Sequence, residues 1–253
     1  MIYRPRPRSA RYTRAVCTLV ILRDRVAGHP LVIGANRDER RDRPWTPPRR
    51  TGGWIAPRDE RAGGTWIGVS DAGVVVAATN WNPAPAPDPT RPSRGELVSL
   101  ALDAPDAAAA LDRVLTRARR EAFNGFQLFI GDRTRADVIH APDGRATKVD
   151  AVPRGFHVVT SRWRLGRFDH EGALDPADLP ADTAPADAFA TLARVLAVHE
   201  DDGPRGPDAI CKHRDDRGTL SSAIIAVPTG ASAATFLFAA GPPCEAPFEP
   251  VRG

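Results

Sequence analysis

The sequence is poor in cysteine and contains no long apolar run. Its three cysteines, Cys17, Cys211 and Cys244, are an odd number in a chain of this size, which argues against a disulfide framework and favours a reducing compartment. No apolar run approaches the roughly 20 residues that a membrane span needs. Segment 16–22 is largely apolar, but it is short, and charged residues follow it without a secretory cleavage site. We therefore predict a cytoplasmic protein with no membrane span and at least one free thiol.

Clustered positive charge and phosphate-binding loops are also lacking. The formal net charge is +4, but five arginines lie in residues 1–16, which contain no acid, so the remainder of the chain is close to neutral. A chain without a basic stripe is a poor binder of nucleic acid. The glycine pairs Gly52-Gly53 and Gly63-Gly64 lack the spacing and the following helix of a nucleotide-binding loop. We predict neither a nucleic acid nor a nucleotide as partner.

Residues 1–16 differ in composition from the rest of the chain. They alternate arginine with Pro, Ser and Tyr and show no apolar period, which predicts a disordered tail or a mis-assigned start. An arginine-rich, acid-free start also occurs in organelle transit peptides, although no amphipathic helix is visible here. No linker interrupts the chain after this point. We predict a single domain over residues 17–253.

A strand that ends in polar residues stands out at Leu31 to Glu39. The apolar residues Leu31 to Ile33 favour a buried strand, and four residues that can hydrogen-bond or carry charge follow, Asn36-Arg-Asp-Glu39. Strand ends on a rigid scaffold commonly hold chemical groups in place. The alternative is a solvated turn, because the charged run 40–43 comes next.

The rest of the chain predicts strands and helices in alternating blocks. Two antiparallel hairpins are predicted, 17–22 with 31–35 and 65–70 with 74–79, separated by an irregular packed loop over 43–64. After a proline-rich loop at 82–92, further strands are predicted at 126–130, 136–140, 146–149 and 156–159, and a last hairpin at 221–227 with 233–239.

Three helices are predicted between these strands. The capping box Ser93-Arg-Gly-Glu96 starts the first, Pro105 stands at the first position of the second, and the third spans about 186–199. This order favours an α+β fold, in which helices cover the outer faces of two mostly antiparallel sheets.

Seven short motifs then carry a family resemblance over nearly the whole chain after Val16. They are Cys17-Thr-Leu-Val, Ala35-Asn-Arg-Asp-Glu39, Gly63-Gly-Thr-Trp-Ile-Gly68, Ala78-Thr-Asn80, Ser93-Arg-Gly-Glu96, Phe123-Asn-Gly-Phe-Gln127, and Ile210-Cys-Lys-His213 with Gly218-Thr-Leu-Ser-Ser222. Their order resembles that of the transport and Golgi organisation 2 (NRDE) family, which is similar to the N-terminal nucleophile (Ntn) cysteine hydrolases. The resemblance implies a four-layer αββα sandwich.

The resemblance also implies roles for single residues. An N-terminal Cys supplies a thiol nucleophile together with an α-amine that can accept the thiol proton. Cys17 matches that position, Asp38 matches the residue that orients it, and Asn80 matches the amide that donates to the oxyanion. Arg37 would orient Cys17 or the substrate. The substrate-binding candidates are Asn36, Trp66, Asn124 and Arg217.

Simpler interpretations of the same residues remain open. Cys17 can be a small buried hydrophobe, Asp38 can pair with Arg37, and Asn80 can be a turn residue. The chain also departs from the family, because Leu220 stands where an arginine is common, so only Arg217 is left to supply that cation.

No metal site is predicted from the remaining cysteines. Cys211 and His213 form only a Cys-x-His pair and Cys244 is distant in the sequence, which favours a core cysteine beside a surface histidine.

Two functions of different classes follow from the resemblance. The first is an amidase-like hydrolase that acts on a small linear amide or thioester through Cys17. The second is a non-catalytic carrier of haem, acyl-CoA or lipid, because eukaryotic members of the resembled family are associated with haem trafficking. The sequence has no Cys-Pro or Cys-x-x-Cys-His haem motif, although an axial histidine is possible. No cofactor is predicted, haem is a possible ligand, and oligomeric state is not predicted.

The hydrolase interpretation requires a free α-amine on Cys17. A Cys inside a peptide bond has no α-amine, so residues 1–16 must be absent from the working protein. Either the chain is cleaved after Val16, or translation starts at that position.

Overall fold

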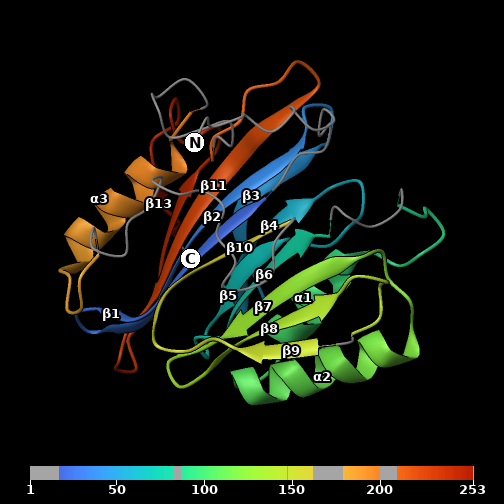
Figure 1. Cartoon of the computed structure of the whole chain (residues 1–253), viewed down its shortest axis with the longest axis horizontal. Coiled ribbons are helices and arrows are strands. Elements are labelled where there is room, and N and C mark those ends of the chain that lie inside the picture. The colour runs from blue at the N-terminus through green and yellow to red at the C-terminus, as the bar shows by residue number, and fades with distance from the viewer. Residues whose placement is uncertain (1–16, 82–86, 147, 162–178, 200–209, 253) are drawn as a thin grey trace, which may run out of the picture.

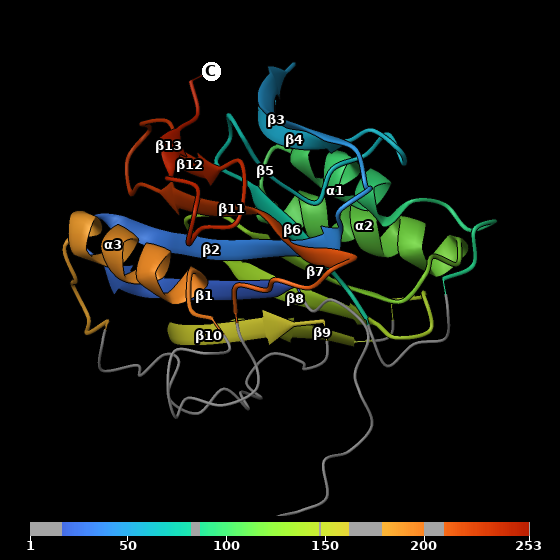
Figure 2. The same cartoon turned by 90° about the horizontal axis from the view of Figure 1, so that it is seen from above.

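The computed structural model describes residues 17–81, 87–146, 148–161, 179–199 and 210–252. The predicted tail 1–16 and part of the proline-rich loop lie outside the described residues. Within them, thirteen strands form a six-stranded and a seven-stranded sheet, and three helices accompany the sheets. Figures 1 and 2 show the two sheets stacked face to face, with α3 outside one sheet and α1 and α2 outside the other.

The six-stranded sheet, called sheet A, has the order β10-β1-β2-β11-β12-β13. Its strands are β1 (Thr18–Val26), β2 (His29–Arg40), β10 (Gly155–Thr160), β11 (Arg217–Val227), β12 (Thr235–Ala239) and β13 (Glu249–Pro250). All of its neighbouring strands are antiparallel. Sheet A therefore joins the start of the described chain to its end.

The seven-stranded sheet, called sheet B, runs in sequence order from β3 to β9 and is also antiparallel. Its strands are β3 (Trp45–Thr51), β4 (Trp54–Asp59), β5 (Ile67–Ser70), β6 (Val75–Asn80), β7 (Phe126–Gly131), β8 (Ala136–Ala141) and β9 (Lys148–Ala151). The predicted α+β class is therefore confirmed, and the layers form a four-layer αββα sandwich.

Three apolar clusters hold the four layers together. One lies between the sheets and includes Leu19 and Ile33 of sheet A with Val75 and Phe129 of sheet B. A second packs sheet B against α1 and α2, and a third packs sheet A against α3. Because successive residues of a strand point to opposite faces, each sheet contributes to two of these clusters. This explains why β1 is buried almost without interruption from Thr18 to Leu22.

The first predicted hairpin is present, and its second strand is longer than expected. Thr18 lies opposite Asn36 in the β1–β2 pair, and β2 continues to Arg40 because β11 pairs with it on its other side. Asn36, Arg37 and Asp38 are each at most 6% exposed. The alternative of a solvated turn is therefore wrong for these three residues. The second predicted hairpin is β5 with β6.

The loop expected over 43–64 is wrong, because this region forms the hairpin of β3 and β4. Prolines cannot donate to a ladder and are tolerated in edge strands and at bulges. Pro47 and Pro48 fit both conditions, since β3 is the edge of sheet B and the register shifts between Thr46 and Arg49.

Two of the three helices that the structure describes, α1 and α2, begin with a side-chain cap, and α3 does not. α1 (Arg94–Leu102) carries the predicted capping box, formed by Ser93 and Glu96. α2 (Ala107–Arg120) starts after Asp106, whose side chain accepts from the Ala109 amide, so the prediction of Pro105 at its first position is wrong. α3 (Pro185–Leu196) has proline in its first turn. In the described part of the chain, none of these helices combines the length and apolar character that crossing a membrane requires.

Candidate active site

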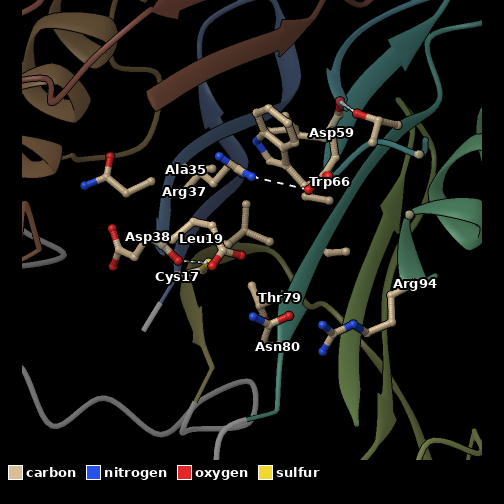
Figure 3. A pocket seen from close by; sticks show the side chains of 18 of the residues that line it. Cys17, Leu19, Ala35, Arg37, Asp38, Asp59, Trp66, Thr79, Asn80 and Arg94 are labelled. Atoms are coloured by element: carbon tan, nitrogen blue, oxygen red, sulfur yellow. Dashed lines mark hydrogen bonds and ion pairs between the residues drawn. The ribbon is translucent and has the colours of Figure 1, made fainter. Parts of the chain in front are cut away.

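A pocket opens where β1, β2, β5 and β6 meet the start of α1. It has a cavity volume of about 110 Å³ and is lined by Cys17, by Arg37 and Asp38 of β2, and by Asn80 at the end of β6. Figure 3 shows these side chains, from both sheets, arranged around the same space. The four residues predicted as catalytic are thus brought to one place.

Cys17 is held by its own backbone at the start of β1. Its amide donates to Ser161 Oγ at 3.1 Å, and its carbonyl accepts from the Ser161 amide at 3.2 Å. Its Sγ points toward β2 and donates to the Asp38 carbonyl at 3.6 Å. Ser161 is fully buried just after β10, and the sequence contains no motif that marks it. The position of the thiol therefore depends on two strands, β2 and β10.

The thiol of Cys17 is a weak acid in this environment. Burial, followed by the negative charge of Asp38, raises its pKa to about 11. A thiol with this pKa is almost entirely protonated at neutral pH and is a poor nucleophile. A nearby cation or base is needed before this thiol can react readily.

Asp38 is buried and paired, but with partners that the sequence analysis missed. Thr219 Oγ1 donates to Asp38 Oδ1 at 2.6 Å, and Lys212 Nζ donates to Asp38 Oδ2 at 2.8 Å. The alternative pairing of Asp38 with Arg37 is wrong, because Arg37 bonds to Asp59 instead. Both missed partners lie more than 170 residues along the chain, and only the pairing of β11 with β2 brings Thr219 opposite Asp38.

Arg37 lies inside the pocket in an aromatic and acidic setting. Its guanidinium carbon is 4.3 Å from the centroid of the Trp66 ring, and Nη2 is 3.3 Å from Asp59, which Arg43 also contacts. Nη1 is buried and has no hydrogen-bond partner among the described residues. Burial is the largest influence on Arg37 and lowers its pKa. A buried guanidinium with an unused donor favours a ligand oxygen at this point.

Asn80 and Arg94 form the wall contributed by β6 and α1. Within the described part of the chain, the Asn80 side chain makes no hydrogen bond, so its amide is available to a ligand. Arg94 extends from the first turn of α1 into the pocket, and its Nη1 donates to the Gly125 carbonyl at 3.0 Å. Burial lowers the pKa of Arg94. Arg94 belongs to the motif Ser93-Arg-Gly-Glu96, which the sequence analysis singled out as a capping box. The motif thus contained a pocket residue that was not predicted.

Of the four predicted substrate-binding residues, two line the pocket and two do not. Trp66 lines the pocket and stacks with Arg37. Asn36 borders it, but its amide donates to the Leu196 and Ile210 carbonyls. Asn124 bonds to the backbone of Asp88, and Arg217 pairs with Asp216, and neither lines the pocket. Arg217 therefore does not replace the family arginine there.

Comparison with known proteins places the chain in a family. The sequence pattern described as Transport and Golgi organisation 2 matches residues 16–165. The chain belongs to this family. A Transport and Golgi organization protein 2 homolog from Bos taurus is 27% identical over 231 residues, covering 78% of this chain and 82% of the relative. A homolog from Mus musculus is 33% identical over 118 residues, covering 43% and 42%.

Two solved structures superpose on this chain over most of its length and share its fold. Penicillin V acylase from Agrobacterium tumefaciens superposes with a TM-score of 0.55 at 14% identity, covering 88% of this chain and 83% of that chain. The N-acylethanolamine-hydrolyzing acid amidase ortholog of Caenorhabditis elegans gives 0.55 at 14% identity, covering 83% and 92%. This chain therefore has an Ntn-hydrolase-like fold. The family match includes Cys17, Asp38, Asn80 and Arg94.

Proposed function

We propose that this protein is an Ntn-type cysteine hydrolase that cleaves a small amide or thioester through Cys17. The observation that carries the proposal is the position of the Cys17 thiol. It lies in a pocket with Asp38 on one side and, on another, the Asn80 amide, which has no hydrogen-bond partner among the residues that the structure describes. The two similar solved structures, an acylase and an acid amidase, support the same reaction class.

The proposed reaction uses a chain that begins at Cys17. The free α-amine accepts the thiol proton, and Sγ attacks the carbonyl carbon of the substrate. The carbon–nitrogen bond then breaks, the amine leaves with the proton from the α-ammonium, and a thioester to Cys17 remains. Water, deprotonated by the α-amine, attacks this thioester. The carbon–sulfur bond breaks, the sulfur takes the proton back from the α-ammonium, and a carboxylic acid leaves. A thioester substrate follows the same path with a thiol as the leaving group.

The surroundings of Cys17 support this role for the α-amine. Ser161 Oγ already accepts a hydrogen bond from the Cys17 N–H, so it would orient an amine at that position. Because the Asp38 carboxylate raises the thiol pKa when Cys17 is in a peptide bond, a positive α-ammonium beside the thiol would oppose that effect. Asn80 would donate to the developing oxyanion, a contact that contributes roughly 3 to 4 kcal/mol where measured.

The size of the pocket favours a small substrate over a carried ligand. A cavity of about 110 Å³ is well below the roughly 300–1,000 Å³ of sites that enclose drug-sized ligands. Arg37, which is buried, and Arg94, which is half-buried, place two cations along it, which supports a substrate with an acidic or strongly polar end. A haem would need more space, so the carrier role is the weaker proposal.

The test compares the full chain with a chain that begins at Cys17. Both are incubated with a panel of small amides and thioesters, and the protein is then examined by intact mass and peptide mapping. We expect turnover and a trapped acyl group on Cys17 only in the shorter chain. In that chain, Asn80→Ala should lower kcat by about 100-fold to 1,000-fold, as removal of an oxyanion donor does elsewhere.

Two variants make the outcome decisive. Cys17→Ala in the shorter chain should abolish turnover while the circular dichroism spectrum is unchanged. Asn124→Ala is a control for the loss of an amide outside the pocket, since its side chain serves the backbone of Asp88. Unchanged turnover in Cys17→Ala, or stoichiometric haem binding without any turnover, would refute the hydrolase proposal.

A further inference from the structure

Four potential metal ligands meet on sheet A, outside the pocket described above. His199 follows α3, Cys211 and His213 precede β11, and Cys244 follows β12. Their ligand atoms all lie within 4.8 Å of one another. Cys211 is buried and His213 is exposed, as predicted, but Cys244 lies beside both although it is distant in the sequence, because the fold brings these segments together.

The spacing of these atoms matches a tetrahedral zinc site. Cys211 Sγ is 3.6 Å from Cys244 Sγ and 3.6 Å from His213 Nε2, and His213 Nε2 is 3.2 Å from Cys244 Sγ. Zn–S bonds of about 2.3 Å and Zn–N bonds of about 2.0 Å give tetrahedral edges of about 3.8 Å between sulfurs and about 3.5 Å between sulfur and nitrogen. Three edges of the cluster thus already have nearly the required lengths.

The ring of His199 completes the set. It packs edge-on against the His213 ring with centroids 5.0 Å apart, so the two imidazoles share one side of the cluster. On the far side of His213, Nδ1 approaches Glu245 Oε1 at 3.7 Å, which leaves Nε2 directed at the cysteines. Zinc-binding histidines are commonly oriented in this way by a carboxylate near the other ring nitrogen.

The chemistry of the donors selects the metal. Two thiolates and two neutral imidazoles around Zn²⁺ give a neutral site, and Cys₂His₂ is a common ligand set of structural zinc. The sulfur atoms are not bonded to each other, since all three cysteines are free thiols. Four protein ligands leave no open coordination position, so this site has a structural role and not a catalytic one.

We propose that His199, Cys211, His213 and Cys244 bind one zinc ion, which fixes the segment that carries Lys212. Lys212 stands between two of these ligands, and its Nζ donates to Asp38 at 2.8 Å. The Lys212 backbone amide donates a hydrogen bond to Thr219 Oγ1, and the same hydroxyl donates to Asp38. Zinc at this site therefore holds in place both groups that position the Asp38 carboxylate beside the pocket.

The test uses the full chain, expressed with zinc in the medium and purified under reducing conditions without chelator. Elemental analysis should find one zinc per chain. Cobalt exchanged into the site should give the intense visible bands of a tetrahedral ion and the near-ultraviolet bands of thiolate-to-cobalt charge transfer. Cys244→Ser should weaken zinc binding by more than about 100-fold, because even residues outside the first ligand shell change affinity by about 10–100-fold.

Matched controls separate this site from others in the chain. Cys17→Ser and His29→Gln each remove a residue of the same type that lies outside the cluster, so both should keep one zinc. If Cys244→Ser fails to fold, the cobalt spectrum of the unmodified chain still shows whether the cluster binds a metal through its thiolates. A zinc-free chain whose cobalt spectrum shows no thiolate bands overturns the proposal. So does a disulfide between Cys211 and Cys244 in the purified protein, or haem at the cluster in place of zinc.

Discussion

At the scale of single residues, the reactivity of Cys17 depends on the atom bonded to its nitrogen. In the described structure that nitrogen is an amide that donates to Ser161. The thiol pKa is then about 11, raised by burial and by Asp38. A free α-amine, with a pKa of about 7.7 to 8.0, would place a base or a cation next to the same thiol.

This difference predicts how alkylation of Cys17 changes with pH. In the full chain Cys17 is almost entirely a protonated thiol at pH 7, and its thiolate fraction grows about tenfold for each unit that the pH rises toward the pKa. Labelling by iodoacetamide should therefore be slow at pH 7 and accelerate up to about pH 11. In a chain that begins at Cys17, labelling should already be fast at pH 7. Timed peptide mapping measures both rates, and equal rates in the two chains at pH 7 would contradict the prediction.

Some of the residues around Cys17 could be predicted from the sequence, and others could not. Cys17, Arg37 and Asp38 lie near each other because one tight hairpin joins their strands, and a short hairpin can be read from local pattern. Ser161, Lys212 and Thr219 reach the same place through pairings of β10 with β1 and of β11 with β2. No local pattern encodes those pairings. The same reason explains why Cys244 was not associated with Cys211.

At the scale of elements, the prediction failed where proline was taken as a sign of irregular structure. The β3–β4 hairpin contains three prolines, Pro47, Pro48 and Pro57, yet it pairs with the rest of sheet B. The alternation that marks a strand is weak there, because β3 lies at an edge and is mostly exposed. The strands of the central hairpins are buried and β-branched, which is why their positions were predicted correctly.

The first turn of α1 is in close backbone contact with the segment Gly64-Thr65, through Gly95. A Cβ at Gly95 would lie 2.9 Å from both the nitrogen and the oxygen of Thr65, and one at Gly64 would lie 2.7 Å from the carbonyl carbon of Gly95. Real Cβ atoms do not approach backbone atoms so closely, so a side chain here would push the helix outward. Arg94, which precedes Gly95, would move with it.

We therefore predict that Gly95→Ala lowers the free energy of unfolding by about 1–3 kcal/mol, the usual cost of overpacking. Gly230→Ala is the matched control, because a Cβ at Gly230 meets no atom within 4 Å. Urea denaturation of both variants measures the difference. Equal stability of the two variants would show that α1 can shift without cost. In an active chain, Gly95→Ala should also raise KM, since Arg94 lines the pocket.

At the scale of the whole molecule, the core between the sheets joins the two halves of the fold. It contains Leu19 and Ile225 of sheet A together with Val69 and Phe129 of sheet B. Neither sheet can expose its inner face without exposing that of the other. The predicted single domain over residues 17–253 should therefore unfold as one unit, although chains of this length often do not.

Two optical probes test this prediction. Four of the five tryptophans, Trp45, Trp54, Trp66 and Trp81, lie in or next to strands of sheet B, and Trp163 lies outside the described residues, so tryptophan fluorescence reports mainly on that sheet. Far-ultraviolet circular dichroism reports on both sheets. We expect the two urea transitions to coincide with a single midpoint. Separate midpoints would mean that sheet A and sheet B belong to independent folding units.

The hydrogen bond between Thr219 and Asp38 spans 181 residues, and this separation has a consequence in time. At roughly 5–20 residues per second, a ribosome that has just made β2 needs on the order of ten to forty seconds to reach β11. Until then β2 has one edge without a partner, and the Asp38 carboxylate lacks both Thr219 and Lys212. The nascent chain therefore carries an unpaired strand edge through most of its synthesis, which makes this stage the one most exposed to aggregation and to chaperone binding.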